Sequence, residues 1–244
     1  MLPWIHGLIG TTLIERIFPD GTSIVLYILL ALLPAVIGYL LGSVNVSIIL
    51  SHFYKDDIRT HGSGNAGMTN VMRVWGKGAA LITLLGDFFK TAVAILLGAI
   101  WMGETGAYIA GIFSIIGHVW PVFFGFRGGK GVVSLLGLVL CTEPLCALLL
   151  IVIFVGLVAT TKYISLGSII GSMLYPVVLN RIYPWAHETA GVPIVPTVVS
   201  FIAMIIIVIK HRENIQRLMK GNENKLSFHK TVKEAESTEE EPKA

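Results

Sequence analysis

The chain is dominated by apolar stretches that are long enough to cross a lipid bilayer. A helix needs about 20 predominantly apolar residues to cross a hydrocarbon core of about 30 Å. Apolar residues make up 54% of the 244 residues and charged residues only 14%, whereas a soluble domain carries about 25% charged residues. The sequence therefore predicts a single all-α integral membrane domain rather than a soluble protein.

About seven transmembrane helices are expected. Two segments in the middle of the chain are short for a full crossing, and only Glu143 and Pro144 separate them clearly. If the chain did not turn there, the two segments would merge into one helix and the orientation of all earlier segments would invert. The predicted segments span residues 24–50, 79–101, 106–124, 132–142, 145–160, 164–180 and 194–210.

The positive charges favour one orientation of these segments. With the amino terminus outside, all but three of the 18 lysines and arginines lie in the loops and the tail on the inner side. The exceptions are Arg16 and Arg181, which fall outside, and Lys90, which lies within the second segment. This uneven distribution follows the positive-inside rule and predicts a cytoplasmic carboxyl terminus.

The two ends of the chain differ from its apolar centre. The first residues lack a basic region and are interrupted by charges such as Glu15 and Arg16, so we expect no cleavable signal peptide. A short interfacial helix is one interpretation of this stretch. The last residues are rich in Lys and Glu and are predicted to be disordered. The expected organisation is an amino-terminal extension (1–23), a membrane domain (24–225) and a charged cytoplasmic tail (226–244).

A first polar segment follows the first predicted helix and is rich in glycine. Gly62, Gly64 and Gly67 match the spacing of a dinucleotide-binding loop, but that motif requires a preceding β-strand, and here a membrane helix precedes it. The alternatives are an ordinary polar loop and a loop whose backbone amides approach an anion beside a fixed cation. The polar side chains available for such an anion site are Ser63, Asn65, Asn70 and Arg73.

A second glycine-rich segment opens the fourth predicted helix. Gly128, Gly129 and Gly131 surround Lys130, which is the composition of an anion cradle whose amides and helix dipole face a phosphate. The spacing is not that of a Walker motif, and no Ser or Thr follows the lysine. A glycine hinge with one snorkelling lysine is the alternative. His118, shortly before this segment, is either an interface anchor or part of the site.

Polar residues also gather at the end of the last predicted helix. His211 and Asn214 lie three residues apart, so on a helix they share one face and can converge on one ligand. A polar helix end at the lipid headgroups is the alternative. Within the second segment, Asp87 and Lys90 are expected to form an ion pair, because an unpaired charge at the bilayer centre costs about 3 kcal/mol.

Other chemistries have weaker support. His52 and Asp57 have the His-x4-Asp spacing of acyltransferases that use acyl-CoA or acyl-carrier-protein donors, but the other motifs of that group are missing. A transporter or lipid scramblase would place polar groups near the midplane and show paired halves, whereas these polar segments gather on one face and no inverted repeat is found. No cluster of His, Cys and carboxylate residues has ligand spacing, so we expect no metal or cofactor.

Taken together, the polar segments resemble the bacterial acyl-phosphate-dependent glycerol-3-phosphate acyltransferases, the PlsY family. The sequence departs from the family pattern at Asn45, where proline is usual, and at Met68, where alanine is commoner. The resemblance covers roughly residues 26–225 and rests on motifs at residues 62–73, 118–131 and 211–223, with further matches at residues 76–78, 83–90 and 163–166.

The resemblance implies a seven-helix enzyme of the bacterial inner membrane whose active site faces the cytoplasm. Such an enzyme transfers a fatty acyl group from acyl phosphate to the sn-1 hydroxyl of glycerol 3-phosphate. The products are lysophosphatidic acid and phosphate, and the reaction is the first acylation of phospholipid synthesis. The implied partners are the two substrates, the lipid bilayer and a soluble enzyme that forms acyl phosphate; nucleic acid is not expected.

The expected site combines catalytic, substrate-binding and structural residues. In the family the first motif's serine and arginine are required for activity, the glycine–lysine loop binds phosphate, and the glutamate after the last helix is structurally important. The residues expected here are Ser63, Arg73, Lys130, His211 and Asn214 as catalytic, Gly62, Gly64, Asn65, Asn70, His118, Gly128, Gly129, Gly131 and Ser165 as substrate-binding, and Asp87, Lys90 and Glu223 as structural.

The implied chemistry explains why cations are needed. Two phosphate dianions must meet in the site, and Arg73 and Lys130 supply the compensating charge. Acyl phosphate is already activated, so positioning and charge stabilisation can replace a covalent nucleophile. The proton of the attacking hydroxyl is taken either by His211 or by a substrate phosphate.

Overall fold

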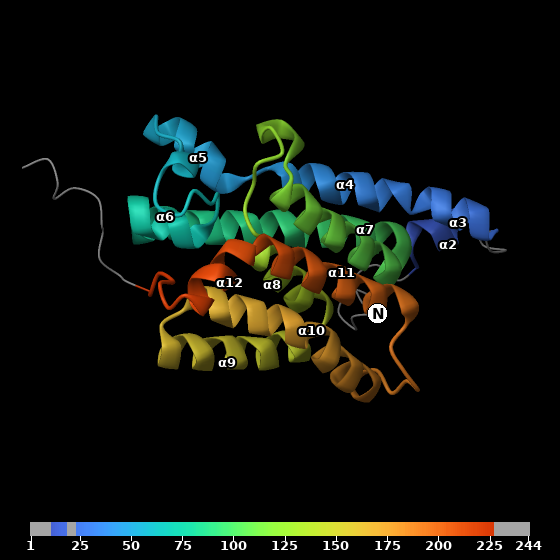
Figure 1. Ribbon diagram of the computed structural model, residues 1–244. Helices are drawn as coiled ribbons and strands as arrows, with labels where there is room; N and C mark the ends of the chain where they lie inside the picture. Colours follow the sequence, from blue (N-terminus) through green and yellow to red (C-terminus); the bar gives the residue numbers. More distant parts are fainter. Residues whose placement is uncertain (1–10, 19–22, 227–244) are drawn as a thin grey trace, which may run out of the picture.

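The computed structural model describes residues 11–18 and 23–226, and every regular element in these ranges is a helix (Figure 1). Residues 1–10 and 19–22 of the predicted extension lie outside the described residues. So does the predicted charged tail, apart from Leu226. The elements are α2 (Leu13–Ile17), α3 (Ile24–Leu30), α4 (Leu32–Ser43), α5 (Val46–Tyr54), η1 (Ile58–Thr60), α6 (Met68–Trp75), α7 (Lys77–Val119), η2 (Val122–Phe124), α8 (Val132–Thr142), α9 (Pro144–Thr161), α10 (Ile164–Ala186), α11 (Ile194–Lys210) and α12 (Arg212–Met219).

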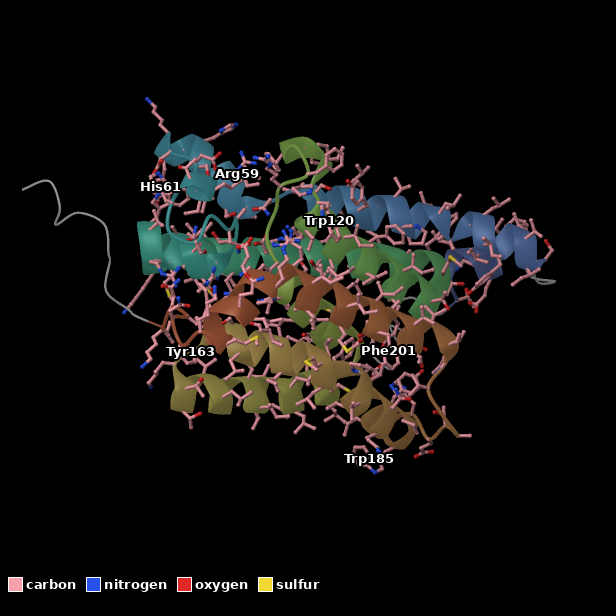
Figure 2. All side chains as sticks on the ribbon, in the orientation of Figure 1. Arg59, His61, Trp120, Tyr163, Trp185 and Phe201 are labelled. Carbon is pink, nitrogen blue, oxygen red and sulfur yellow. The ribbon has the colours of Figure 1, made fainter. Side chains whose placement is uncertain are left out.

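Several of these helices have the length and composition of membrane spans. Three helical segments in the described part of the chain qualify: Ile24–Tyr54, Lys77–Phe124 and Pro144–Thr161. A fourth qualifies if α11 and α12, which are bent by 58° relative to each other, are taken as one span. Apolar side chains such as that of Trp185 project outward from the helices (Figure 2). The all-α membrane character expected from the sequence is therefore present.

The first apolar segment is broken, although the sequence predicted one helix over residues 24–50. At the break between α4 and α5, the Lys90 ammonium donates a hydrogen bond of 2.8 Å to the carbonyl of Val44. The side chain of Asn45 then caps α5 by accepting a hydrogen bond from the amide of Ile48. The chain therefore departs from a straight helix at Val44–Asn45, where Asn45 stabilises the new helix start.

The long helix α7 contains a reversal of direction. Met102 and Gly103 have non-helical backbone angles, and Gly103 has a φ of 63° that favours glycine. A Cβ atom built on Gly98 would lie 2.2 Å from the carbonyl oxygen of Gly106. Eight residues of straight helix would separate the two by about 12 Å, so the two halves of α7 fold back on each other. This reversal separates the predicted segments 79–101 and 106–124.

Small residues hold α4 against the second half of α7. Cβ atoms built on Gly38 and Gly42 would lie 2.3 and 2.2 Å from the carbonyl oxygens of Ala110 and Ser114. Such backbone-to-backbone approach is typical of helix packing in membranes. It fixes the carboxyl end of α7, which carries His118, beside the break between α4 and α5.

The remaining helices pack around a shared apolar core and agree closely with the predicted segments. Glu143 interrupts the helix between α8 and α9, and Pro144 occupies the first position of α9, where its missing N–H costs nothing. α10 continues six residues beyond the predicted end at residue 180. Hydropathy had suggested an earlier end because Asn180 and Arg181 are polar, but both lie on a helix that continues through Pro184.

Candidate active site

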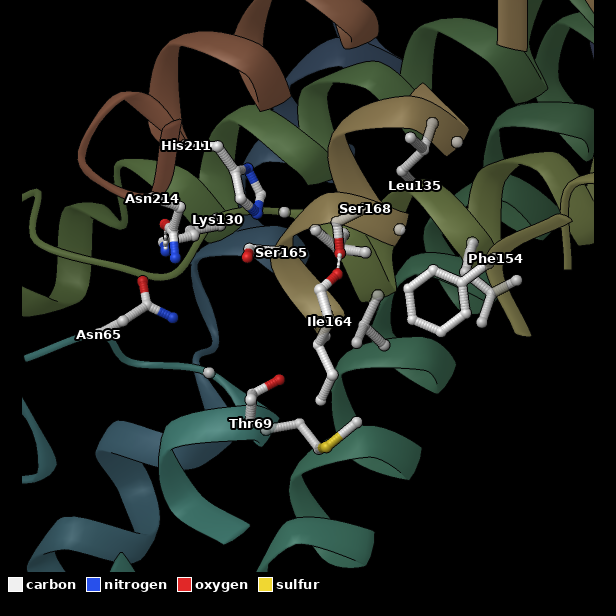
Figure 3. A pocket seen from close by; sticks show the side chains of 18 of the residues that line it. Asn65, Thr69, Lys130, Leu135, Phe154, Ile164, Ser165, Ser168, His211 and Asn214 are labelled. Carbon is white, nitrogen blue, oxygen red and sulfur yellow. Dashed lines mark hydrogen bonds between the residues drawn. The ribbon is translucent and has the colours of Figure 1, made fainter. Parts of the chain in front are cut away.

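All three polar segments reach one cavity of about 330 Å³. In the close view, Asn65, Lys130, His211 and Asn214 lie at one end, while Leu135 and Phe154 lie away from them (Figure 3). The cavity therefore joins a polar end to an apolar end. Of the residues predicted for the site, those that line it are Ser63, Asn65, Asn70, Arg73, Asp87, His118, Lys130, Gly131, Ser165, His211, Asn214 and Glu223.

The first glycine-rich loop is held in shape by Asn70. Its side-chain oxygen accepts a hydrogen bond of 2.9 Å from the amide of Ser63. Its side-chain nitrogen donates to the carbonyls of Ile58 and His61, at 3.1 and 3.0 Å. The amide group of Asn70 is thus engaged with the backbone at both its oxygen and its nitrogen. Asn70 is thus a clamp for the loop that carries Ser63; it also lines the cavity, and its binding of substrate stays a prediction.

The glycines of this loop have conformational roles. Gly62 and Gly64 have φ values of 60° and 69°, which residues with a side chain rarely adopt. A Cβ atom on Gly62 would also lie 2.3 Å from the side-chain oxygen of Asn70. Neither glycine lines the cavity, contrary to the prediction that both bind substrate. They allow the tight turn that brings Ser63 and Asn65 to the cavity wall.

The prediction of an anion cradle is wrong for Gly128 and Gly129. Their amides donate to the carbonyls of Val119 and His118, at 3.3 and 3.1 Å, and are therefore occupied. A Cβ atom on Gly128 would lie 2.0 Å from the His118 carbonyl oxygen, and one on Gly129 would lie 2.1 Å from the His118 ring. The two glycines let the loop pack against the end of α7. Sequence alone does not separate this packing role from anion binding.

The start of α8 offers the donors that the preceding glycines do not. Gly131 is the N-cap of this 11-residue helix, with a φ of 82°, and no side chain caps the helix start. The first amides of a helix have no intrahelical partner, and the helix dipole favours negative charge there. Lys130, Gly131, Val132 and Val133 all line the cavity. A phosphate group would therefore meet the helix terminus and the lysine together.

Lys130 is connected to the last polar segment. Its ammonium group donates a hydrogen bond to the side-chain oxygen of Asn214. Burial, together with the nearby charge of Arg217, lowers the pKa of Lys130 to about 8. The lysine is therefore a cation whose charge is costly until an anion enters the cavity.

Glu223 organises the side chains around Lys130. Its carboxylate accepts hydrogen bonds from the hydroxyl of Ser165 at 3.0 Å and from the side-chain amide of Asn214 at 2.8 Å. The other carboxylate oxygen pairs with the guanidinium of Arg217 at 2.8 Å. Because Asn214 donates to Glu223, its oxygen is turned toward Lys130. Glu223 thus contacts three other side chains, which agrees with the structural role expected for it. One of the three, Arg217, had not been predicted for the site.

His211 lies at the bend between α11 and α12 and is buried. Its Nδ1 atom lies 2.8 Å from the carbonyl oxygen of Ile207. A carbonyl oxygen only accepts, so Nδ1 carries the proton, and Nε2 of the neutral ring is left as an acceptor. His211 and Asn214 both line the cavity, as their spacing had suggested. The histidine can therefore receive a proton at Nε2.

A buried charge cluster supports the wall of the cavity. The Lys90 ammonium lies 2.8 Å from a carboxylate oxygen of Asp87, and the predicted ion pair is present. The same ammonium lies 2.9 Å from Nδ1 of His118 and 2.8 Å from the Val44 carbonyl oxygen. Lys90 itself does not line the cavity, while Asp87 and His118 do. The contact with Lys90 holds the ring of His118 in place, so its Nδ1 atom is not available to a ligand.

The His-x4-Asp pattern does not form a site. Asp57 is paired with Arg59 at 2.8 Å, which lowers the pKa of its carboxyl group through the hydrogen bond between them. His52 is exposed on α5, and neither His52 nor Asp57 lines the cavity. The structure therefore gives no support for a catalytic dyad of these two residues.

The apolar end of the cavity was not predicted from the sequence. It is formed by α8, α9 and α10, and α10 contributes small residues at helical spacing, from Ser165 through Gly167 and Ser168 to Gly171 and Ser172. The helical spacing of these small residues is visible in the sequence and could have indicated that they share one face of α10. It resembles ordinary helix packing in membranes, however, so it does not indicate a cavity by itself.

Known proteins of one family match this chain. Residues 32–221 match the family described as Glycerol-3-phosphate acyltransferase. The glycerol-3-phosphate acyltransferase of Thermoanaerobacter pseudethanolicus is 44% identical over 204 residues, which cover 83% of this chain and 99% of that protein. The glycerol-3-phosphate acyltransferase of Halalkalibacterium halodurans is 43% identical over 201 residues, covering 80% and 95%.

Solved structures with a similar fold are also available. Two crystal structures of PlsY (YgiH), an integral membrane glycerol 3-phosphate acyltransferase, each cover 81% of this chain and 96% of their own. The glycerol 3-phosphate form has a TM-score of 0.72 and 32% identity. The lysophosphatidic acid form has a TM-score of 0.70 and 31% identity.

Proposed function

The chain belongs to the glycerol-3-phosphate acyltransferase family and makes lysophosphatidic acid; we propose that its acyl donor is acyl phosphate and that the acyl group goes to the sn-1 hydroxyl. The observation that carries this proposal is the convergence of Arg73, Lys130 and His211 on one cavity with an apolar end. Cations suit two phosphate groups, and an apolar wall suits an acyl chain.

The reaction balances with groups that the cavity holds. The hydroxyl oxygen of glycerol 3-phosphate attacks the carbonyl carbon of acyl phosphate, and an ester bond forms. The bond between that carbon and the phosphate oxygen breaks, and phosphate leaves with the electron pair. The hydroxyl proton passes to Nε2 of His211 and from there to the leaving phosphate, which departs as hydrogen phosphate and leaves the ring neutral again. No covalent acyl-enzyme is needed, because the donor is already activated.

In this proposal the two cationic residues bind different phosphate groups. Arg73 holds one phosphate through its planar guanidinium, and Lys130 holds the other together with the first amides of α8. Ser63 and Asn65, which line the cavity together with Arg73, can donate hydrogen bonds to the substrates or accept them. Asn214, set by Glu223, keeps Lys130 in place until the substrate anion replaces its hydrogen bond.

The topology in our proposal has seven crossings with the amino terminus outside and the site at the cytoplasmic face. The reversal at Met102–Gly103 and the break at Glu143 support this count. The uneven distribution of lysines and arginines supports the orientation. Residues 24–225 form the acyltransferase domain, with an extension before it and a charged tail after it. A soluble enzyme that forms acyl phosphate would deliver the donor at the same face.

The donor is tested with detergent-purified protein, glycerol 3-phosphate and either palmitoyl phosphate or palmitoyl-CoA. We expect release of phosphate and formation of lysophosphatidic acid with the acyl phosphate alone. His52→Ala should behave as the wild type, because this residue lies outside the cavity. Turnover with palmitoyl-CoA that is lost in His52→Ala would overturn the proposed donor.

The role of His211 is tested by His211→Ala. Loss of a general base lowers the rate by about 10²–10⁴-fold, so kcat should fall by that amount at pH 7. His52→Ala is the matched control, since it removes an exposed histidine. If His211→Ala retains turnover within about tenfold of the wild type, a substrate phosphate takes the proton instead.

The pKa of Lys130 predicts a pH dependence. The cationic form binds phosphate, and it is lost as the pH rises through about 8. The kcat/KM for glycerol 3-phosphate should therefore fall above that pH, whereas the substrate phosphate, with its second pKa near 6, no longer changes charge. Lys130→Arg should remove this fall, because the pKa of arginine is about 12 or higher and its side chain stays charged over the whole pH range of the assay. Lys130→Ala should raise KM at all pH values, and an unchanged KM would contradict the role given to Lys130.

The orientation is tested by cysteine labelling in intact bacteria, with Cys141 and Cys146 replaced by serine. A membrane-impermeant maleimide should label Ala190→Cys in the exposed loop between α10 and α11. Thr60→Cys and Arg127→Cys, which are exposed beside the two glycine-rich segments, should react only after lysis. Labelling of either of these in intact cells would place the site on the outer face.

A further inference from the structure

The apolar end of the cavity has one position where a missing side chain leaves open space. We propose that Gly171 determines the length of acyl chain that the enzyme accepts, an inference that rests on the proposed function. Gly171 lies on α10 and lines the cavity. A Cβ atom built there would meet no other atom within 4 Å.

The position of Gly171 fits the path of a chain that starts at the polar end. Lining residues of α10 run from Ser165, beside Glu223, to Ser172. The seven helical steps from Ser165 to Ser172 correspond to about 10 Å along the helix. Gly171 lies near the far end of this path, so a side chain added there would meet the distal part of an acyl chain rather than the carbonyl group that reacts.

The wall around Gly171 suits methylene groups rather than polar ligands. The hydroxyl of Ser168 donates to the carbonyl of Ile164 at 2.9 Å, and that of Ser172 donates to the carbonyl of Ile169 at 2.8 Å. Both hydroxyls are thus bonded within α10. The facing side of α9 contributes only apolar lining residues, which are Ala147, Leu150, Ile151 and Phe154.

Neighbouring glycines show that this open space is local. At Gly167, one helical turn earlier, a Cβ atom would lie 2.8 Å from the ring of Phe154. Tyr175, one helical turn later on α10, is fully buried. The space at Gly171 therefore lies between a tight contact one turn earlier and a buried side chain one turn later, and a larger side chain at Gly171 would fill it.

The test is a competition between two donors in one reaction. Wild type and Gly171→Leu each receive equimolar octanoyl phosphate and palmitoyl phosphate with glycerol 3-phosphate, and mass spectrometry gives the ratio of the two lysophosphatidic acids. The product ratio reports relative kcat/KM and does not depend on how much enzyme is folded. Apolar pockets discriminate by about tenfold or more per methylene, so we expect Gly171→Leu to lower the palmitoyl-to-octanoyl ratio at least about tenfold.

Two further variants sharpen the result. Gly171→Ala should shift the ratio in the same direction by a smaller factor. Gly156→Leu is the matched control: a Cβ atom there also meets nothing within 4 Å, but the residue lies on the exposed side of α9 outside the cavity. It should leave the ratio unchanged.

The outcomes separate this inference from the proposed function. An unchanged ratio in Gly171→Leu, or an equal shift in Gly156→Leu, would overturn the role of Gly171 while the wild type still uses both donors. If the wild type forms no product from either acyl phosphate, the proposed donor is wrong and the inference about Gly171 falls with it.

Discussion

The buried ammonium group of Lys90 is the interaction on which the architecture of the site depends. It joins Asp87 on its own helix, His118 at the end of the same helix after the reversal, and the Val44 carbonyl at the break before α5. A charge in an apolar core must be paired, so these three groups have to come together for the chain to fold in a membrane. Their meeting places both glycine-rich loops next to each other.

The loops then meet a second network that is centred on a carboxylate. Glu223 holds Ser165, Asn214 and Arg217, and through Asn214 it reaches Lys130. The first network fixes the two loops and the second fixes the residues from the last helices. The groups that we propose to be catalytic line the cavity between these networks, so Lys130 and Arg73 are partly accessible while hydrogen bonds hold the residues around them.

The sequence predicted which segments reach the cavity, but it did not predict the contacts that each residue makes there. Lys130, His211 and Asn214 were predicted to meet at one site, and all three line the cavity. The role of Gly128 and Gly129 could not be predicted, because glycine serves equally for close packing and for anion binding, and only the contacts with His118 decide between them. The clamping role of Asn70 could not be predicted for a similar reason, since the backbone groups that it binds come together only in the folded loop.

The position of Glu223 in the chain has a consequence for biosynthesis. It follows α12, the last described helix, yet it sets the orientation of Asn214 and Ser165. During translation the network can therefore close only after all the described helices and Glu223 itself have been synthesised. A chain that stops before Glu223 lacks the carboxylate that orients Asn214 and Ser165, so these two side chains are oriented late in synthesis.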